Sequence, residues 1–142
     1  MSDKTKGRCL CGEVTYEFTG EPNWTAHCHC ESCRRNTSSS MTSFLGINRE
    51  NYQFTGNKPK IYESSPGVRR HFCGSCGSPV AYDADYYAHE IHFYLAALED
   101  PEKFSPQIHV FHGEKLSWLH LGDDLQKFEG NSDDTAGSGN PD

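Results

Sequence analysis

Hydrophobic and polar residues alternate along short stretches of this chain, and this alternation predicts β-strands. In residues 13–18, Val14, Tyr16 and Phe18 take every second position, with acidic residues and threonine between them. This is the pattern of a strand with one buried face. Turn-forming glycine, proline and asparagine follow it. By the same signals we expect further strands at 41–47, 52–54, 60–63, 68–72, 79–82, 90–97 and 107–111.

The segments between these strands predict turns and loops with little helix. Residues 1–7 form a polar lead-in. Residues 24–27 lead into residues 28–33, which are expected to form a loop or the first turn of a short helix. Residues 100–104 are expected to form one helical turn, because Pro101 suits the first position of a helix. Many short strands separated by glycine and proline predict a mainly β fold in a single domain.

The composition changes near the C-terminus. Of the 142 residues 35% are hydrophobic, but from Gly130 onward small polar residues dominate and no aromatic or aliphatic residue larger than Ala136 remains. Such a segment cannot bury enough apolar surface to offset the entropy lost on ordering. We therefore expect a folded domain at 1–129 and a disordered C-terminal tail at 130–142.

The charge and hydropathy of the chain argue against several classes of partner. Its formal net charge of −7 repels nucleic acid, so no nucleic-acid partner is expected. No apolar run approaches the roughly 18 residues that a membrane-spanning helix needs, so no membrane is expected either. Residues 1–8 are polar and charged and contain no secretory apolar segment, which favours a cytoplasmic location.

Seven cysteines in three short clusters carry the strongest chemical signal. They form a first pair, a central cluster and a last pair, which are Cys9 and Cys11, then Cys28, Cys30 and Cys33, then Cys73 and Cys76. Close thiols on tight turns supply soft ligands to zinc. Disulfides or buried thiols are the alternative, but an odd number of cysteines and the absence of a secretory segment fit disulfides poorly. The clusters therefore predict zinc.

The number of cysteines also indicates how they divide. A structural zinc has four protein ligands and a catalytic zinc has three with one open position, and seven is four plus three. The central cluster is compact enough to supply three ligands, which leaves the first pair to meet the last pair. The alternative is a zinc ribbon built from Cys30, Cys33, Cys73 and Cys76. The separation between its two cysteine pairs is longer than the common ribbon spacing of about 15–20 residues.

In this order the three clusters resemble those of the glutathione-dependent formaldehyde-activating enzymes and the related centromere protein V group. The resemblance covers residues 7–128. It rests on the motifs G-x-C-x-C-G, C-H-C-x-x-C-R and F-C-x-x-C-G-S, and on the later segments L-A-A-L-E-D, P-Q-I-H-V and Trp118. It departs from the family at residues 36–39, where members often have a glycine and this chain has Asn-Thr-Ser-Ser.

The resemblance implies a β-rich, Mss4-like zinc-binding fold with two zinc ions per chain. A structural zinc is implied at the first and last pairs (Cys9, Cys11, Cys73 and Cys76). A second, open zinc is implied at the central cluster (Cys28, Cys30 and Cys33), with a thiol or water as the fourth ligand. The ligands of the open zinc are then the catalytic residues.

The resemblance also implies an activity. It is that of a carbon–sulfur lyase similar to S-(hydroxymethyl)glutathione synthase, which adds or removes a glutathione-like thiol at a small aldehyde such as formaldehyde. A zinc on three thiolates is a soft Lewis acid that suits a sulfur ligand, and a thiol bound there loses its proton. Holding the aldehyde beside that sulfur accelerates the addition by proximity. The alternative is a non-catalytic module that binds a thiol or a partner, with structural zincs.

Several other residues are weaker candidates. Arg34 and Arg35 can pair with the carboxylates of glutathione, or form a solvated basic turn. His27 and His29 can shuttle protons or complete a metal shell, but we expect exposed loop histidines. Residues 69–71 are expected on a strand surface, and residues 86–87 are expected to pack rather than line a pocket. No histidine metal site is expected, because strand positions three apart point to opposite faces in the pairs His89 and His92, and His109 and His112.

Overall fold

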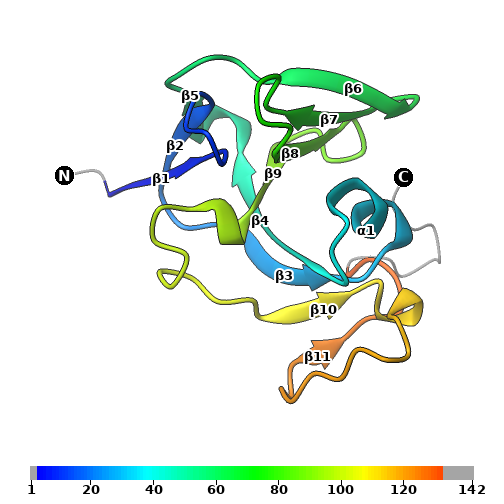
Figure 1. Ribbon diagram of the computed structural model, residues 1–142. Coiled ribbons are helices and arrows are strands. Elements are labelled where there is room, and N and C mark those ends of the chain that lie inside the picture. Colours follow the sequence, from blue (N-terminus) through cyan, green and yellow to red (C-terminus); the bar gives the residue numbers. More distant parts are fainter. Residues whose placement is uncertain (1–2, 133–142) are drawn as a thin grey trace.

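In a computed structural model, residues 3–132 are described, and they form a mainly β domain (Figure 1). The strands in chain order are β1 (Lys4–Arg8), β2 (Thr15–Thr19), β3 (Trp24–Cys28), β4 (Thr42–Asn48), β5 (Tyr52–Phe54), β6 (Lys60–Ser65), β7 (Val68–Phe72), β8 (Pro79–Ala84), β9 (Glu90–Tyr94), β10 (Ile108–Val110) and β11 (Gln126–Lys127). The helical elements are α1 (Glu31–Thr37) and the 3-10 turns η1 (Arg49–Asn51), η2 (Leu95–Ala97) and η3 (His112–Glu114).

The strands form two sheets. The smaller sheet has the order β1-β2-β5, and the larger has the order β11-β10-β3-β4-β9-β8-β7-β6. Neighbouring strands are antiparallel except that β10 runs parallel to both β3 and β11. Figure 1 shows β6 and β7 at the top and β10 and β11 at the bottom, with α1 between these two ends of the larger sheet. The prediction of a mainly β, single-domain fold is confirmed.

The core lies between the smaller sheet and strands β4, β8 and β9. The alternation in β2 buries Tyr16 and Phe18, as predicted. The ring of Tyr16 stacks on that of Phe93 in β9 with 4.2 Å between centroids, and Tyr52 packs edge-on against Phe93 at 5.4 Å. Such aromatic pairs contribute about 0.5–1.5 kcal/mol beyond the burial of their area. This packing holds the smaller sheet against the larger one.

Three local predictions were wrong: those for residues 1–7, for the end of the strand at 90–97 and for residues 100–104. The polar lead-in contains β1, which pairs with β2 and buries Thr5 and Gly7. Residues 24–27 lie in β3, which pairs with β4 along its whole length, and α1 begins at Glu31, within the segment expected to be a loop or the first turn of a short helix. The strand expected at 90–97 ends at Tyr94 and continues as η2. Residues 100–104 form a turn closed by the Lys103 amide donating to the Asp100 carbonyl, and they form no helix.

The C-terminal part of the described chain contacts the domain. The amide of Phe111 donates to the carbonyl of Gly130 at 2.9 Å, and the side-chain amide of Asn131 donates to the hydroxyl of Tyr87 at 2.8 Å. Residues 133–142 of the expected tail lie outside the described residues, so the disorder of the tail stays a prediction.

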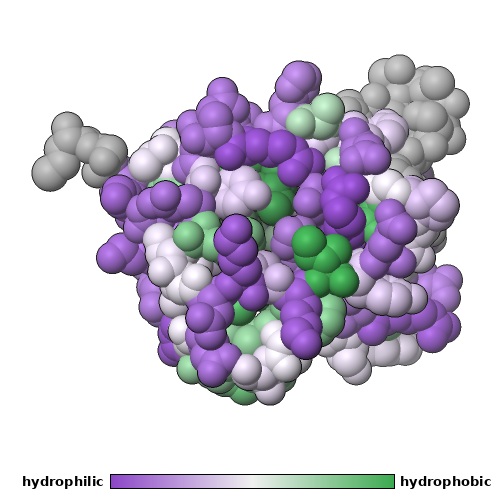
Figure 2. All heavy atoms as spheres, turned by 90° about the horizontal axis from the view of Figure 1, so that it is seen from above, coloured by the Kyte–Doolittle hydropathy of each residue, from purple (hydrophilic) through white to green (hydrophobic). Residues whose placement is uncertain are grey.

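The surface over β6 is mostly hydrophilic, and its apolar patches are small and separate (Figure 2). Exposed Ile61 and Tyr62 belong to this edge strand, which also carries Lys60 and Glu63. Charged residues on an edge strand oppose pairing with another chain. Among residues 3–132, no helix is long and apolar enough to cross a membrane.

Candidate metal centres

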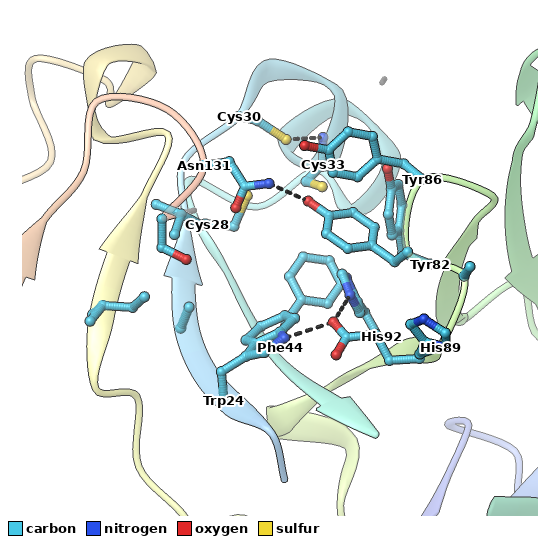
Figure 3. A pocket seen from close by; sticks show the side chains of 17 residues that line it. Trp24, Cys28, Cys30, Cys33, Phe44, Tyr82, Tyr86, His89, His92 and Asn131 are labelled. Carbon is cyan, nitrogen blue, oxygen red and sulfur yellow. Dashed lines mark hydrogen bonds and ion pairs between the residues drawn. The ribbon is translucent and has the colours of Figure 1, made fainter. Parts of the chain in front are cut away.

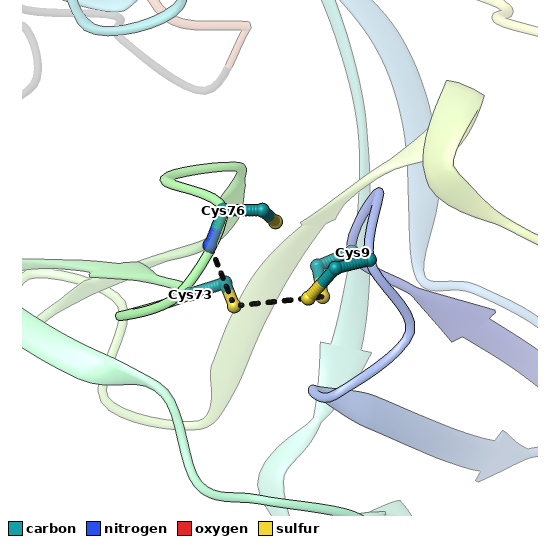
Figure 4. A group of neighbouring side chains, drawn as sticks. Cys9, Cys73 and Cys76 are labelled. Carbon is teal, nitrogen blue, oxygen red and sulfur yellow. Dashed lines mark hydrogen bonds between the residues drawn. The ribbon is translucent and has the colours of Figure 1, made fainter.

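The first and last cysteine pairs meet in space although more than sixty residues separate them in the chain. Cys9 and Cys11 lie in the loop after β1, and Cys73 and Cys76 lie in the turn between β7 and β8 (Figure 4). The Sγ atom of Cys11 is 3.6 Å from that of Cys9 and 3.7 Å from that of Cys73. Two sulfurs bound tetrahedrally to one zinc at about 2.3 Å lie roughly 3.8 Å apart. The four sulfurs therefore fit a single zinc ion.

Several groups donate hydrogen bonds to the sulfurs of the last pair. The amides of Ser75 and Cys76 both donate to Sγ of Cys73 at 3.4 Å. A hydrogen bond from the Ser78 hydroxyl lowers the pKa of Cys76 to about 5. Since zinc binds the thiolate and not the thiol, these donors favour the form that a metal needs.

The central cluster gathers three further sulfurs at the junction of β3 and α1. Cys28 is the last residue of β3, Cys30 caps the N-terminus of α1, and Cys33 lies in its first turn. The Cys33 amide donates to Sγ of Cys30 at 3.4 Å. All three side chains are buried, and their sulfurs lie within 4.8 Å of one another. The geometry thus divides the cysteines four plus three and does not assemble the zinc ribbon.

A buried arginine lies beside the central cluster. Nη1 of Arg70, in β7, is 3.8 Å from Sγ of Cys33, and its guanidinium lies 5.1 Å from the ring centre of Tyr82. Hydrogen bonds from Cys28 and Cys30, aided by the Arg70 charge, hold the pKa of Cys33 well below its usual range. Cys33 is therefore the first of the three thiols to ionise. One thiolate with an adjacent cation is a suitable starting state for binding a metal.

The expectation that residues 69–71 lie on the strand surface was wrong. Arg70 and His71 are buried, because β7 lies between β6 and β8 in the larger sheet. Arg70 shares its strand face with the fully buried Val68 two residues earlier. That period-two spacing was the available sequence signal for an inward-pointing arginine.

A cavity of about 410 Å³ opens next to the central cluster. Figure 3 shows the three cysteines at one end, Tyr82 and Tyr86 along one side, and Trp24 at the opposite end. Its wall is mostly aromatic and aliphatic, with Phe44, Ile108 and Val110 among its members, and among residues 3–132 no lysine or arginine lines it. Cavities of this size and character accommodate small organic ligands.

The end of the cavity remote from the sulfurs holds a buried carboxylate. Glu90 accepts hydrogen bonds from Nε1 of Trp24 at 2.7 Å, from Nε2 of His92 at 2.7 Å and from Nδ2 of Asn23 at 3.0 Å. Burial raises the pKa of Glu90, but these donors outweigh burial and lower it overall. The carboxylate thus orients Trp24 and His92 in the cavity wall.

The remaining predicted residues are placed as follows. Arg35 is exposed and pairs with Glu31 at 2.7 Å, and neither it nor Arg34 lines the cavity. Nε of Arg34 is buried without a hydrogen-bond partner among the described residues. Tyr86 and Tyr87 do line the cavity, so the expectation that they only pack was wrong. Residues 36–39, where the sequence departs from the family pattern, do not line the cavity.

The histidine expectations were wrong as well. His29 is fully buried, and His27 is a half-buried member of β3, so neither is an exposed loop histidine. The structure also brings ligand atoms of His27, His109 and Asp123 within 4.8 Å of one another. The spacing argument missed this group because its members come from three separate segments of the chain.

Comparisons with known proteins agree with this architecture. The family model of the glutathione-dependent formaldehyde-activating enzyme matches residues 4–114, which include all seven cysteines. An uncharacterized lyase of Schizosaccharomyces pombe is 33% identical over 73 residues, 51% of this chain and 53% of that protein, so the match spans about half of the relative. A Rhodobacter sphaeroides protein of known crystal structure has a TM-score of 0.56 at 21% identity, over 71% of this chain and 91% of the other, and this likeness concerns the fold alone.

Proposed function

Because this chain belongs to the glutathione-dependent formaldehyde-activating enzyme family, we propose that it is a zinc-dependent carbon–sulfur lyase. It adds a glutathione-like thiol to a small aldehyde such as formaldehyde, or removes it. The observation that carries this proposal is the position of Cys28, Cys30 and Cys33 at one end of an apolar cavity. The relative named as a lyase supports the same reaction class.

In this proposal the two sulfur sites have different tasks. Cys9, Cys11, Cys73 and Cys76 hold a structural zinc that joins β1 to the turn between β7 and β8, and four thiolates leave it no open position. Cys28, Cys30 and Cys33 hold the second zinc. With three protein ligands, that ion supplies a Lewis-acidic open position at which a substrate thiol loses its proton.

The chain's own residues bind and orient the reactants. Phe44 and Tyr82 form an aromatic part of the cavity wall on which the reactants can pack. In the addition, the substrate sulfur forms a bond to the aldehyde carbon, the carbonyl π bond opens, and the thiol proton finishes on the aldehyde oxygen. Hydrogen bonds from Cys28 and Cys30, with help from the Arg70 charge, favour the thiolate form of Cys33. Closeness of the two reactants supplies most of the acceleration.

For glutathione as the thiol, the carboxylates require a cation. The cavity lining contains none, so we assign this role to Arg34 and Arg35, which follow Cys33 directly in α1. Both residues carry planar guanidinium groups, which pair with carboxylates through two parallel hydrogen bonds. A cytoplasmic place of action, where thiols stay reduced, is part of the same proposal.

The second candidate is a module that binds a thiol without turnover. It is favoured by the position of His92, which Figure 3 shows towards the Trp24 end of the cavity and away from the three cysteines. Binding of the thiol is then the same as in the enzyme. The two candidates differ only in whether the adduct with formaldehyde forms faster than in buffer.

Cobalt substitution tests the proposal, because the thiolate-to-cobalt charge-transfer band grows with the number of bound sulfurs. Glutathione is expected to raise this band in the wild type and to leave it unchanged in Cys30→Ser lacking the second metal. Formation of the formaldehyde adduct, followed by mass spectrometry, then separates enzyme from binding module. If no thiol changes the band in the wild type, the second site is closed by the protein, and both candidates are replaced by a structural role.

A further inference from the structure

The face of β3 and β10 that points away from the cavity carries a cluster of histidines. Trp24, Ala26 and Cys28 of β3 line the cavity, and so do Ile108 and Val110 of β10. Side chains alternate along a strand, so His27 and His109 point to the opposite face. The parallel register places these two residues side by side, and their ring centres are 4.9 Å apart.

An acidic residue from a distant segment joins this pair. Asp123 lies between η3 and β11, and both of its carboxylate oxygens are 3.0 Å from Nε2 of His109. Nitrogen and oxygen ligands about 2.0–2.1 Å from one ion lie roughly 2.9–3.4 Å apart at octahedral or tetrahedral angles. The His109–Asp123 separation therefore already equals that of two ligands on one ion. The third member, His27, has a ligand atom within 4.8 Å of both.

The other ring nitrogen of each histidine is held by a neighbour. Nδ1 of His27 is 2.8 Å from the hydroxyl of Ser43, and Nδ1 of His109 is 2.8 Å from Nε2 of the fully buried His29. Metal-binding histidines are characteristically oriented in this way, with one nitrogen on the ion and the other hydrogen-bonded. Here the arrangement leaves Nε2 of both His27 and His109 for a ligand.

We propose that His27, His109 and Asp123 bind one divalent transition-metal ion at a third site, separate from both thiolate clusters. Two imidazoles and one carboxylate suit Zn²⁺, Co²⁺ or Ni²⁺ and not the soft ions that prefer thiolates. The ion ties the segment before β11 to the outer face of β3 and β10. The exposed Asp123 gives it access from solvent. This site is independent of the thiol chemistry proposed above.

Co²⁺ titration of the purified full chain with zinc on its thiolate clusters tests the proposal. A further equivalent is expected to add weak d–d absorption without any rise in the thiolate charge-transfer band, since its ligands are nitrogen and oxygen. His27→Ala and Asp123→Asn are expected to lose this equivalent, measured also as bound metal per chain after dialysis. Ser43→Ala is expected to bind it about tenfold more weakly, because His27 loses its orienting partner.

His120→Ala is the matched control, because this histidine is exposed and lies outside the cluster. It is expected to bind the additional equivalent as the wild type does. The variants His27→Ala and Asp123→Asn avoid the fully buried His109 and keep the fold testable by circular dichroism. The proposal is overturned if the wild type takes up no nitrogen- and oxygen-ligated cobalt, or if both variants bind as much as His120→Ala. In that case a hydrogen bond joins His109 and Asp123, and no metal ion binds between them.

Discussion

The guanidinium of Arg70 lies 3.8 Å from the sulfur of Cys33, although 37 residues separate them in the chain. Arg70 is 5% exposed, so solvent screens its charge little. An opposite charge at this distance shifts the pKa of its partner by about 1–3 pH units. Arg70 therefore lowers the pKa of a thiol in the central cluster, although it does not line the cavity.

Replacing Arg70 is expected to weaken metal binding at the central cluster near neutral pH. In Arg70→Met the Cys33 thiol loses its neighbouring cation, so its pKa rises, and the metal must displace a proton that is held more tightly. The pH at which the second metal equivalent is half bound should rise by about 1 unit. Arg69→Met is the control, because Arg69 pairs with Asp83 and Asp85 and not with a sulfur. Equal curves for the two variants would contradict the assigned role.

Substitutions in the two sulfur sites are expected to differ in effect. Cys73→Ser removes a ligand from the site that joins β1 to the β7–β8 turn, and it should give unfolded or insoluble protein. Cys30→Ser affects the site at the end of β3 and should leave a folded chain with about one metal ion fewer. Circular dichroism and metal analysis on both variants check this. Equal loss of structure in the two would show that the sites share the structural role.

Asp83 is expected to make the stability of the domain depend on pH in the acid range. Its carboxylate pairs with Arg49 at 2.9 Å, with Arg69 at 3.1 Å and with His71 at 3.1 Å, which hold its pKa well below the usual value. A lowered pKa in the folded state stabilises the fold above the unfolded value of about 3.9, and this contribution disappears as the pH falls below it.

Asp83→Asn should therefore lower the unfolding free energy at pH 7 by roughly 2–3 kcal/mol, the size of a lost charge-assisted hydrogen bond or more. It should also flatten the fall in stability below about pH 4. Asp85→Asn is the comparison, since its exposed side chain, also paired with Arg69, should matter by no more than about 1 kcal/mol. Urea denaturation at several pH values measures both. A steep acid transition that persists in Asp83→Asn would locate its origin in another carboxylate.

Gly46 in β4 is expected to tolerate no side chain. A Cβ atom there would lie 2.5 Å from Nε1 of Trp24, whose indole is held by Glu90 at the end of the cavity. Gly46→Ala should destabilise the domain by about 1–3 kcal/mol through overpacking, and it should displace the Trp24 ring. Thermal unfolding and tryptophan fluorescence report these two effects. Gly122→Ala is the control, because a Cβ there meets no atom within 4 Å, and a similar loss in that variant would disprove the packing explanation.

Features that depend on residues close together in the sequence were predictable from the sequence. The period-two alternation identified β2 to within about two residues, because a half-buried strand requires it, and the apolar run at 41–47 identified β4 equally closely. The central cluster was recognisable for a similar reason. Three cysteines within six positions cannot lie far apart whatever the fold, since consecutive Cα atoms are about 3.8 Å apart. The resemblance carried by these motifs led to the family that the comparison with its model shows.

Contacts between distant segments were decided by the tertiary structure. Pairing with β2 turned the polar residues Lys4–Arg8 into a strand, although their side chains carry no clear alternation of apolar residues. The position of β7 in the larger sheet directed Arg70 towards Cys33, and the parallel pairing of β3 with β10 placed His27 beside His109. Local propensity cannot encode these meetings, because they depend on the order of strands in the sheet. The sequence by itself determined which groups are able to bind metal, and only the folded sheet decided which charges and ligands surround them.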